Sequence, residues 1–118
     1  MSRPILAVDV DGVLNAMCRG AAPEGWRDVK VRAGHVDYGY APKFRIRHNP
    51  AHGARLLAIA RETGAELTWC TTWEDQANIR ISPLVGLPQL PWVPMGLMSL
   101  RDTIGCAKAR AMAAYAGD

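Results

Sequence analysis

The feature that most constrains this chain is an apolar run followed at once by two carboxylates and a glycine. Ile5-Leu6-Ala7-Val8 leads into Asp9-Val10-Asp11-Gly12, and apolar residues resume after the glycine. A short, wholly apolar strand over residues 5–10 is typical of a parallel sheet covered on both faces. In open α/β sheets, reactive groups gather outside the carboxyl ends of the strands. Two acids there can divide the work of nucleophile or metal ligand and of proton donor and acceptor. A solvated Asp-rich turn, or a loop around a structural cation, is the alternative, but it does not explain the apolar residues on both sides.

Composition places the chain among small water-soluble domains. Its 118 residues, 49% hydrophobic and 21% charged, fit a single domain over residues 1–118. No apolar stretch approaches the ~20 residues of a membrane span, and Asp9 comes too early for a signal peptide, so we expect a cytoplasmic location. The three cysteines form no C-x-x-C pair, which argues against zinc and disulfides. The net charge of +3 permits an anionic substrate.

The order of the expected elements predicts an α/β fold with a parallel sheet. Basic and apolar residues alternate over residues 28–32 and 43–47, which predicts a small β-hairpin insertion within residues 17–48. Asn49-Pro50 then opens a helix that ends at Gly64. A buried strand over 66–70, a helix capped by Thr72-Trp73-Glu74-Asp75, a short edge strand within 86–94 and a helix over 103–116 follow. This order implies a right-handed, Rossmann-like, three-layer arrangement.

Four side chains then fit one chemistry. Asp9 and Asp11 follow the first strand, Thr71 follows the strand at 66–70, and Lys108 lies in the last helix. Phosphoryl transfer needs a carboxylate nucleophile, a second acid for the leaving oxygen, a hydroxyl for the phosphoryl oxygens and a cation.

The pattern resembles the haloacid dehalogenase-like hydrolase superfamily over nearly the whole chain. The resemblance lies in Asp9-Val-Asp11-Gly12-Val-Leu-Asn15, in Leu67 to Asn78 and in Cys106-Ala-Lys108. Its Trp-x-Thr-x-Trp-Glu run, Trp69 to Glu74, is similar to small bacterial and phage members.

The resemblance implies a phosphomonoesterase with an aspartyl-phosphate intermediate. Asp9 would be the nucleophile, and Asp11 the general acid and then the base for water. Thr71, with backbone amides near Gly12 and Thr72, would hold the phosphoryl group, and Lys108 would balance its charge. Mg²⁺ would bind the Asp9 carboxylate and the Asp11 carbonyl. A phosphorylated substrate would be attracted by basic residues of the insertion, among them Arg45 and Arg47.

One departure from the family pattern carries consequences. The family's fourth motif, an acidic pair at the end of a strand after the lysine helix, has no counterpart, since Asp118 alone follows that helix and Asp102 precedes it. We therefore expect weak metal binding, a missing C-terminal strand, an exposed first strand and dimerisation or aggregation through it. We interpret the chain as a truncated, frameshifted or trimmed version of a longer enzyme, and a natural short variant that borrows a strand from a partner is the alternative.

Several alternatives stay open at this stage. Thr71 can simply begin a turn, Thr72 can be the phosphate ligand in its place, and Lys108 can be an ordinary solvated lysine. Trp69 and Trp73 are more typical of packing, and the three histidines show no ligand spacing. The basic residues of the hairpin can simply form the solvent-exposed face of a small sheet, or they can attract the end of a nucleic acid. A catalytically inactive fragment or interaction module pairing through its first strand is the competing function, and dehalogenase activity stays open.

Overall fold

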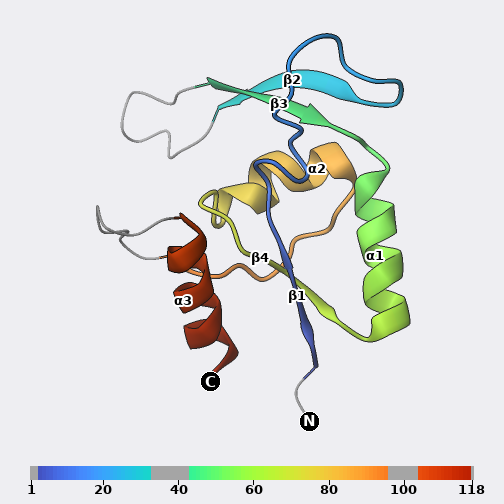
Figure 1. Ribbon diagram of the computed structural model, residues 1–118. Coiled ribbons are helices and arrows are strands. Elements are labelled where there is room, and N and C mark those ends of the chain that lie inside the picture. The colour runs from blue at the N-terminus through green and yellow to red at the C-terminus, as the bar shows by residue number, and fades with distance from the viewer. Residues whose placement is uncertain (1–2, 33–42, 96–103, 118) are drawn as a thin grey trace.

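The chain forms a small mixed α/β domain in which a parallel strand pair and an antiparallel hairpin lie apart (Figure 1). The computed structural model describes residues 3–32, 43–95 and 104–117. Its elements, in chain order, are β1 (Ile5–Val8), β2 (Arg27–Arg32), β3 (Lys43–His48), α1 (His52–Thr63), β4 (Glu66–Trp69), the π-helix η2 (Ala77–Ile81), α2 (Ser82–Val85) and α3 (Ile104–Ala116).

The first buried strand pairs in parallel with the second, as the sequence predicts. In the β1–β4 pair, Val8 lies opposite Trp69. An isolated parallel bridge from Trp69 to Trp92 adds a third short segment beside β4, where an edge strand is expected. Among the described residues the parallel sheet has two strands, so the coarse α/β class is confirmed while a three-layer arrangement is not.

Strand β1 is less covered than its apolar sequence predicts. Val8 is buried, but Ala7 is exposed and Ile5 and Leu6 are only partly buried. In the part of the chain that the structure describes, β1 has a partner strand on one edge, β4. An all-apolar sequence indicates a strand fit for burial but does not show that both its faces are covered.

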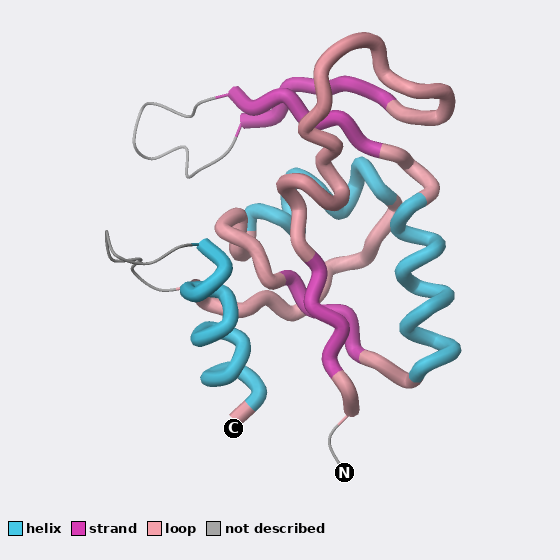
Figure 2. The backbone as a smooth tube through the Cα atoms, viewed as in Figure 1, coloured by secondary structure: helices cyan, strands magenta, loops and turns pink. Residues whose placement is uncertain are grey.

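The predicted hairpin is present as the antiparallel pair β2–β3. Its register sets Asp28 opposite Arg47, Lys30 opposite Arg45 and Arg32 opposite Lys43. The segment joining the two strands, residues 33–42, lies outside the described residues, as do Asp102 and Asp118. Figure 2 shows the hairpin lying beyond the carboxyl ends of β1 and β4.

The helix after the hairpin begins two residues later than its cap sequence predicts. Asn49 Oδ1 accepts the Ala51 N–H at 3.0 Å, which forms a turn, and α1 starts at His52 with no side-chain cap. Gly64 ends α1 in the left-handed conformation, φ 72°, as predicted. Gly53 packs so tightly against the end of α2 that a Cβ there would overlap the Val85 carbonyl.

The capping-box prediction after β4 is wrong in detail. Residues 72–75 form turns, and the helical stretch continues as η2 and α2. Thr71 Oγ1 accepts the Trp73 N–H at 3.2 Å and closes the first of these turns, whereas η2 has Gln76 at its N-cap and no side-chain cap. Asn78 then fixes the π-helix, because its amide bonds both the Trp69 indole and the Leu90 backbone at 2.8 Å.

The core lies between these elements and extends to α3. The main cluster joins β1, β3, β4, η2 and α2, with Trp69 and Val10 fully buried. A second cluster of Cys70, Val93 and Met95 receives Ala111 and Met112 of α3. No helix in the described part of the chain is long and apolar enough to cross a membrane.

Candidate functional site

The predicted nucleophile and the predicted cation form an ion pair. Asp9 directly follows β1, and its Oδ2 lies 2.6 Å from Lys108 Nζ of α3. The Asp9 side chain is 35% exposed and that of Lys108 is 20% exposed, so solvent reaches the pair but does not surround it. The Val10 N–H donates to Asp9 Oδ1 at 2.8 Å, so both carboxylate oxygens are held. Lys108 is therefore paired with Asp9 and is not an ordinary solvated helix lysine.

The second acid is held from two elements. Asp11 Oδ1 accepts a hydrogen bond from Asn15 Nδ2 at 3.0 Å, and Oδ2 accepts one from Trp73 Nε1 at 3.3 Å. Gly12 makes the turn between Asp11 and Asn15 at φ 80°, a conformation that favours glycine, and its N–H donates to the Asn15 carbonyl at 2.9 Å. The Asp11 carboxylate is exposed yet oriented.

The two threonines follow β4 at the same sheet end as the acids. Since Val8 is opposite Trp69, Asp9 and Cys70 continue the register, and Thr71 follows at once. Thr71 is 1% exposed and its oxygen caps the next turn, whereas Thr72 is exposed. Thr71 thus closes a turn, which is the alternative that the sequence leaves open, and the hydrogen of its hydroxyl can still donate to another group. The exposed Thr72 hydroxyl fits the alternative assignment equally well.

Cys70 lies beside the ion pair. Burial is the main cause that raises the pKa of its thiol above the ordinary value, Lys108 lowers it and Asp9 raises it. Cys70 is 5% exposed, and its thiol stays protonated at neutral pH. It packs the site and does not compete with Asp9 as a nucleophile.

The two hairpin arginines expected to bind substrate lie on the other side of the hairpin from this site. Phe44 and Ile46 point inward: Ile46 is buried in the core, and the Phe44 ring lies 5.8 Å from the Trp73 ring. Because side chains alternate along a strand, Arg45 and Arg47 point to the opposite face.

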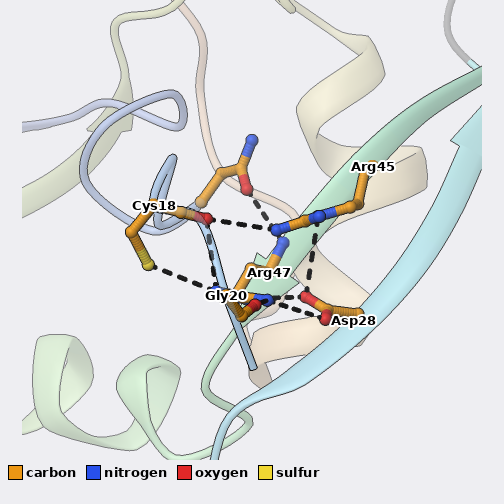
Figure 3. Close-up of polar contacts among 6 residues, drawn as sticks. Cys18, Gly20, Asp28, Arg45 and Arg47 are labelled. Atoms are coloured by element: carbon orange, nitrogen blue, oxygen red, sulfur yellow. Dashed lines mark hydrogen bonds and ion pairs between the residues drawn. The ribbon is translucent and has the colours of Figure 1, made fainter. Parts of the chain in front are cut away.

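Arg47 has a structural role there. Its side chain is 1% exposed and bonds Asp28 through Nε at 2.8 Å and Nη2 at 3.0 Å (Figure 3). It also donates to the carbonyls of Cys18 and Gly20 and to the Cys18 sulfur. The hydrogen bond from Arg47 is the main cause that lowers the pKa of Asp28, and Asp28 in turn raises the pKa of Arg47. A guanidinium with its donors used in this way is not available to a substrate.

The donor chemistry suits a weakly held magnesium ion. Mg²⁺ is commonly bound by one or two carboxylates and substrate phosphate while it keeps several waters. Asp9 offers a carboxylate and Asp11 a backbone carbonyl. Within the described residues no group of three or more His, Cys, Asp or Glu side chains gathers as a metal site.

Two residues of the site were not predicted to have polar roles. Asn15 belongs to the motif that carries the resemblance but has no role assigned by it, and Trp73 is more typical of a packing residue. Asn15 bonds Asp11 and, through Oδ1, accepts the Arg47 N–H at 2.8 Å. The sequence hint is the spacing Asp11-x-x-x-Asn15 across a glycine, which suits a turn closed by side chains.

Comparison with known family models, curated proteins and solved structures finds no match for this chain. The site is therefore interpreted from its own geometry.

Proposed function

We propose that this chain is a Mg²⁺-dependent phosphohydrolase of the haloacid dehalogenase-like type that acts on phosphomonoesters. The observation that carries the proposal is the 2.6 Å contact between Asp9 and Lys108, beside a second carboxylate held by Asn15 and Trp73. The Lys108 ammonium balances the charge of the Asp9 carboxylate, and a neighbouring oriented acid can donate and accept protons.

The proposed reaction has two displacements at phosphorus. An Asp9 oxygen forms a bond to phosphorus while the ester P–O bond breaks, and the leaving oxygen takes a proton from Asp11. Asp11 then accepts a proton from water, whose oxygen attacks phosphorus. The bond between Asp9 and phosphorus breaks, which releases phosphate and restores both residues.

The remaining groups bind and balance charge. Lys108 offsets the charge of the phosphoryl oxygens and of Asp9. Thr71 or Thr72 donates a hydroxyl hydrogen, and backbone amides near Asp11 and Thr72 donate as well, since the Gly12 N–H is already bonded to the Asn15 carbonyl. When bound by Asp9 and the Asp11 carbonyl, Mg²⁺ would add positive charge against the phosphoryl oxygens.

The test is hydrolysis of a generic aryl phosphate with Mg²⁺ by the wild type and by Asp9→Asn. Asp75→Asn serves as a charge-matched control, because Asp75 lies in the turn after β4 and, among the described residues, is not a hydrogen-bond or ion-pair partner of the Asp9, Asp11 or Lys108 side chains. Wild type and Asp75→Asn should turn over, and Asp9→Asn should not. Equal activity in all three proteins would refute the assignment of Asp9.

A second candidate function is a non-catalytic module that pairs with another copy of this chain through β1. It is favoured by the exposed Ala7 and by the single strand neighbour of β1 among the described residues. An open strand edge presents backbone donors and acceptors to another chain. This candidate predicts self-association without any phosphatase activity, whereas the enzyme hypothesis requires activity.

A further inference from the structure

The outer face of the β2–β3 hairpin carries a dense set of positive charges. Lys30 faces Arg45 and Arg32 faces Lys43 across the two strands, and all four side chains are exposed. They share the face of Asp28 and Arg47, opposite the face that packs on the core through Ile46.

This arrangement is unfavourable in the isolated domain. Like charges directly opposite each other on one sheet face repel, and here two such pairs are adjacent. Asp28 is the only acid in either strand, and Arg47 already holds both of its oxygens. Arg45 adds a longer ion pair to the same carboxylate at 3.9 Å. The outermost charges thus lack a compensating acid within the strands, and an anionic ligand would supply one.

The hydrogen bonds of the buried Arg47 hold the loop at Cys18–Gly20 beside this face. By bonding Cys18 and Gly20, Arg47 holds the chain on either side of Arg19, and Arg45 also donates to the Cys18 carbonyl at 3.2 Å (Figure 3). Beside them lies an open cleft of about 280 Å³, lined by Asn15, Ala16, Met17, Cys18, Arg19 and Arg45. The Met17 side chain is 74% exposed at this cleft, which gives an apolar surface next to two arginines.

We propose that this face, which comprises Arg19, Lys30, Arg32, Lys43 and Arg45, binds the backbone of a single-stranded nucleic acid. Residues two apart on one strand face repeat at about 6.8 Å, a separation close to that of neighbouring phosphates on an extended strand. Proteins that bind single strands without sequence preference combine a positively charged groove along the backbone with side chains, usually aromatic, on which the bases stack. Here the exposed Met17 is the apolar side chain beside the charges. The other hairpin face is packed on the core at Ile46, so one face of the hairpin meets the ligand.

The test is the fluorescence anisotropy of a labelled single-stranded oligonucleotide, titrated with the full chain at several salt concentrations. Lys30→Gln/Arg32→Gln removes two charges from the face, and Arg55→Gln/Arg61→Gln removes two exposed charges from α1 as the matched control. With a salt slope of about −0.7 per phosphate contact, the hairpin variant should lose about 1.4 in slope and about 50-fold in affinity at ~50 mM salt. The control variant should bind like the wild type.

The outcomes separate this proposal from the phosphohydrolase. Asp9→Asn should keep full binding, and the hairpin variant should keep aryl phosphate turnover. Absence of binding at low salt would overturn the proposal, as would equal losses in the two double variants. Equal or tighter binding of a duplex of the same length would overturn the single-strand assignment, and tighter binding of an acidic peptide would overturn the nucleic acid assignment.

Discussion

Replacing Asn15 with alanine should reduce both the stability of the fold and the activity of the site. Asn15 is 7% exposed and links Asp11 to the buried Arg47 backbone N–H. Leaving that N–H without an acceptor costs about 1–3 kcal/mol, and losing the bond to Asp11 costs about 0.5–1.5 kcal/mol. We therefore expect Asn15→Ala to lower the free energy of unfolding by about 1.5–4.5 kcal/mol in urea denaturation.

Asn78→Ala provides the matched control for the effect on the site. Asn78 also bridges two segments with its amide, but it contacts Trp69 and Leu90 and not Asp11. Both alanine variants should therefore lose stability by similar amounts. Per folded molecule, only Asn15→Ala should lose turnover, by about 3- to 10-fold, which corresponds to ~0.7–1.4 kcal/mol in the orientation of Asp11.

Two results would refute this reasoning. An Asn15→Ala variant within ~0.5 kcal/mol of the wild type would show that the Arg47 N–H finds another acceptor. Equal loss of turnover per folded molecule in both variants would show that Asn15 acts through general stability and not through Asp11.

Three further predictions each concern a single residue. Gly53→Ala should lower the melting temperature, because its Cβ would overlap the Val85 carbonyl at a cost of about 1–3 kcal/mol. This cost exceeds the ~0.5–1 kcal/mol by which alanine stabilises a helix relative to glycine. An unchanged or higher melting temperature would contradict the close approach. Burial lowers the pKa of His48 below its ordinary value of 6.5, so the unfolded chain binds protons first as the pH falls below about 6.5. The free energy of unfolding should thus decline from pH 7 to pH 5 (about the range in which free histidine titrates) more steeply in the wild type than in His48→Gln, and equal slopes contradict this. Ala7→Lys should reduce self-association in light scattering at high concentration, and a wild type that stays monomeric removes the edge-pairing hypothesis.

The sequence predicts the strand that presents the acids because local pattern determines it. An apolar run followed by Asp9-x-Asp11 places both acids at the carboxyl end of a strand, whatever the arrangement of the other elements. The parallel pairing of β1 and β4 and the ion pair with Lys108 then agree with the predicted arrangement. Contacts between residues far apart in the sequence decide which side chains are buried and which groups they bond, and the local pattern does not show these.

Arg47 illustrates that limit. Alternation predicts that it shares a face with Arg45, but not that the loop at Cys18 and Gly20 folds over it and buries it. The π-helix over Ala77–Ile81 is a similar case, because it is fixed by Asn78 contacts with residues 9 and 12 positions away along the chain. Trp73 combines packing with a bond to an acid 62 residues away, which no local pattern shows.

The most direct measurement of the central claim is detection of phosphate on Asp9. An aryl phosphate has a leaving group good enough to depart without a proton, so Asp11→Asn should complete the first displacement but lack the base for the second. Acid quenching of that variant after mixing with substrate and Mg²⁺, followed by peptide mass analysis, should show one added phosphoryl group on the peptide containing Asp9. The same peptide without that group, in a variant whose folding is unchanged, would contradict the covalent mechanism.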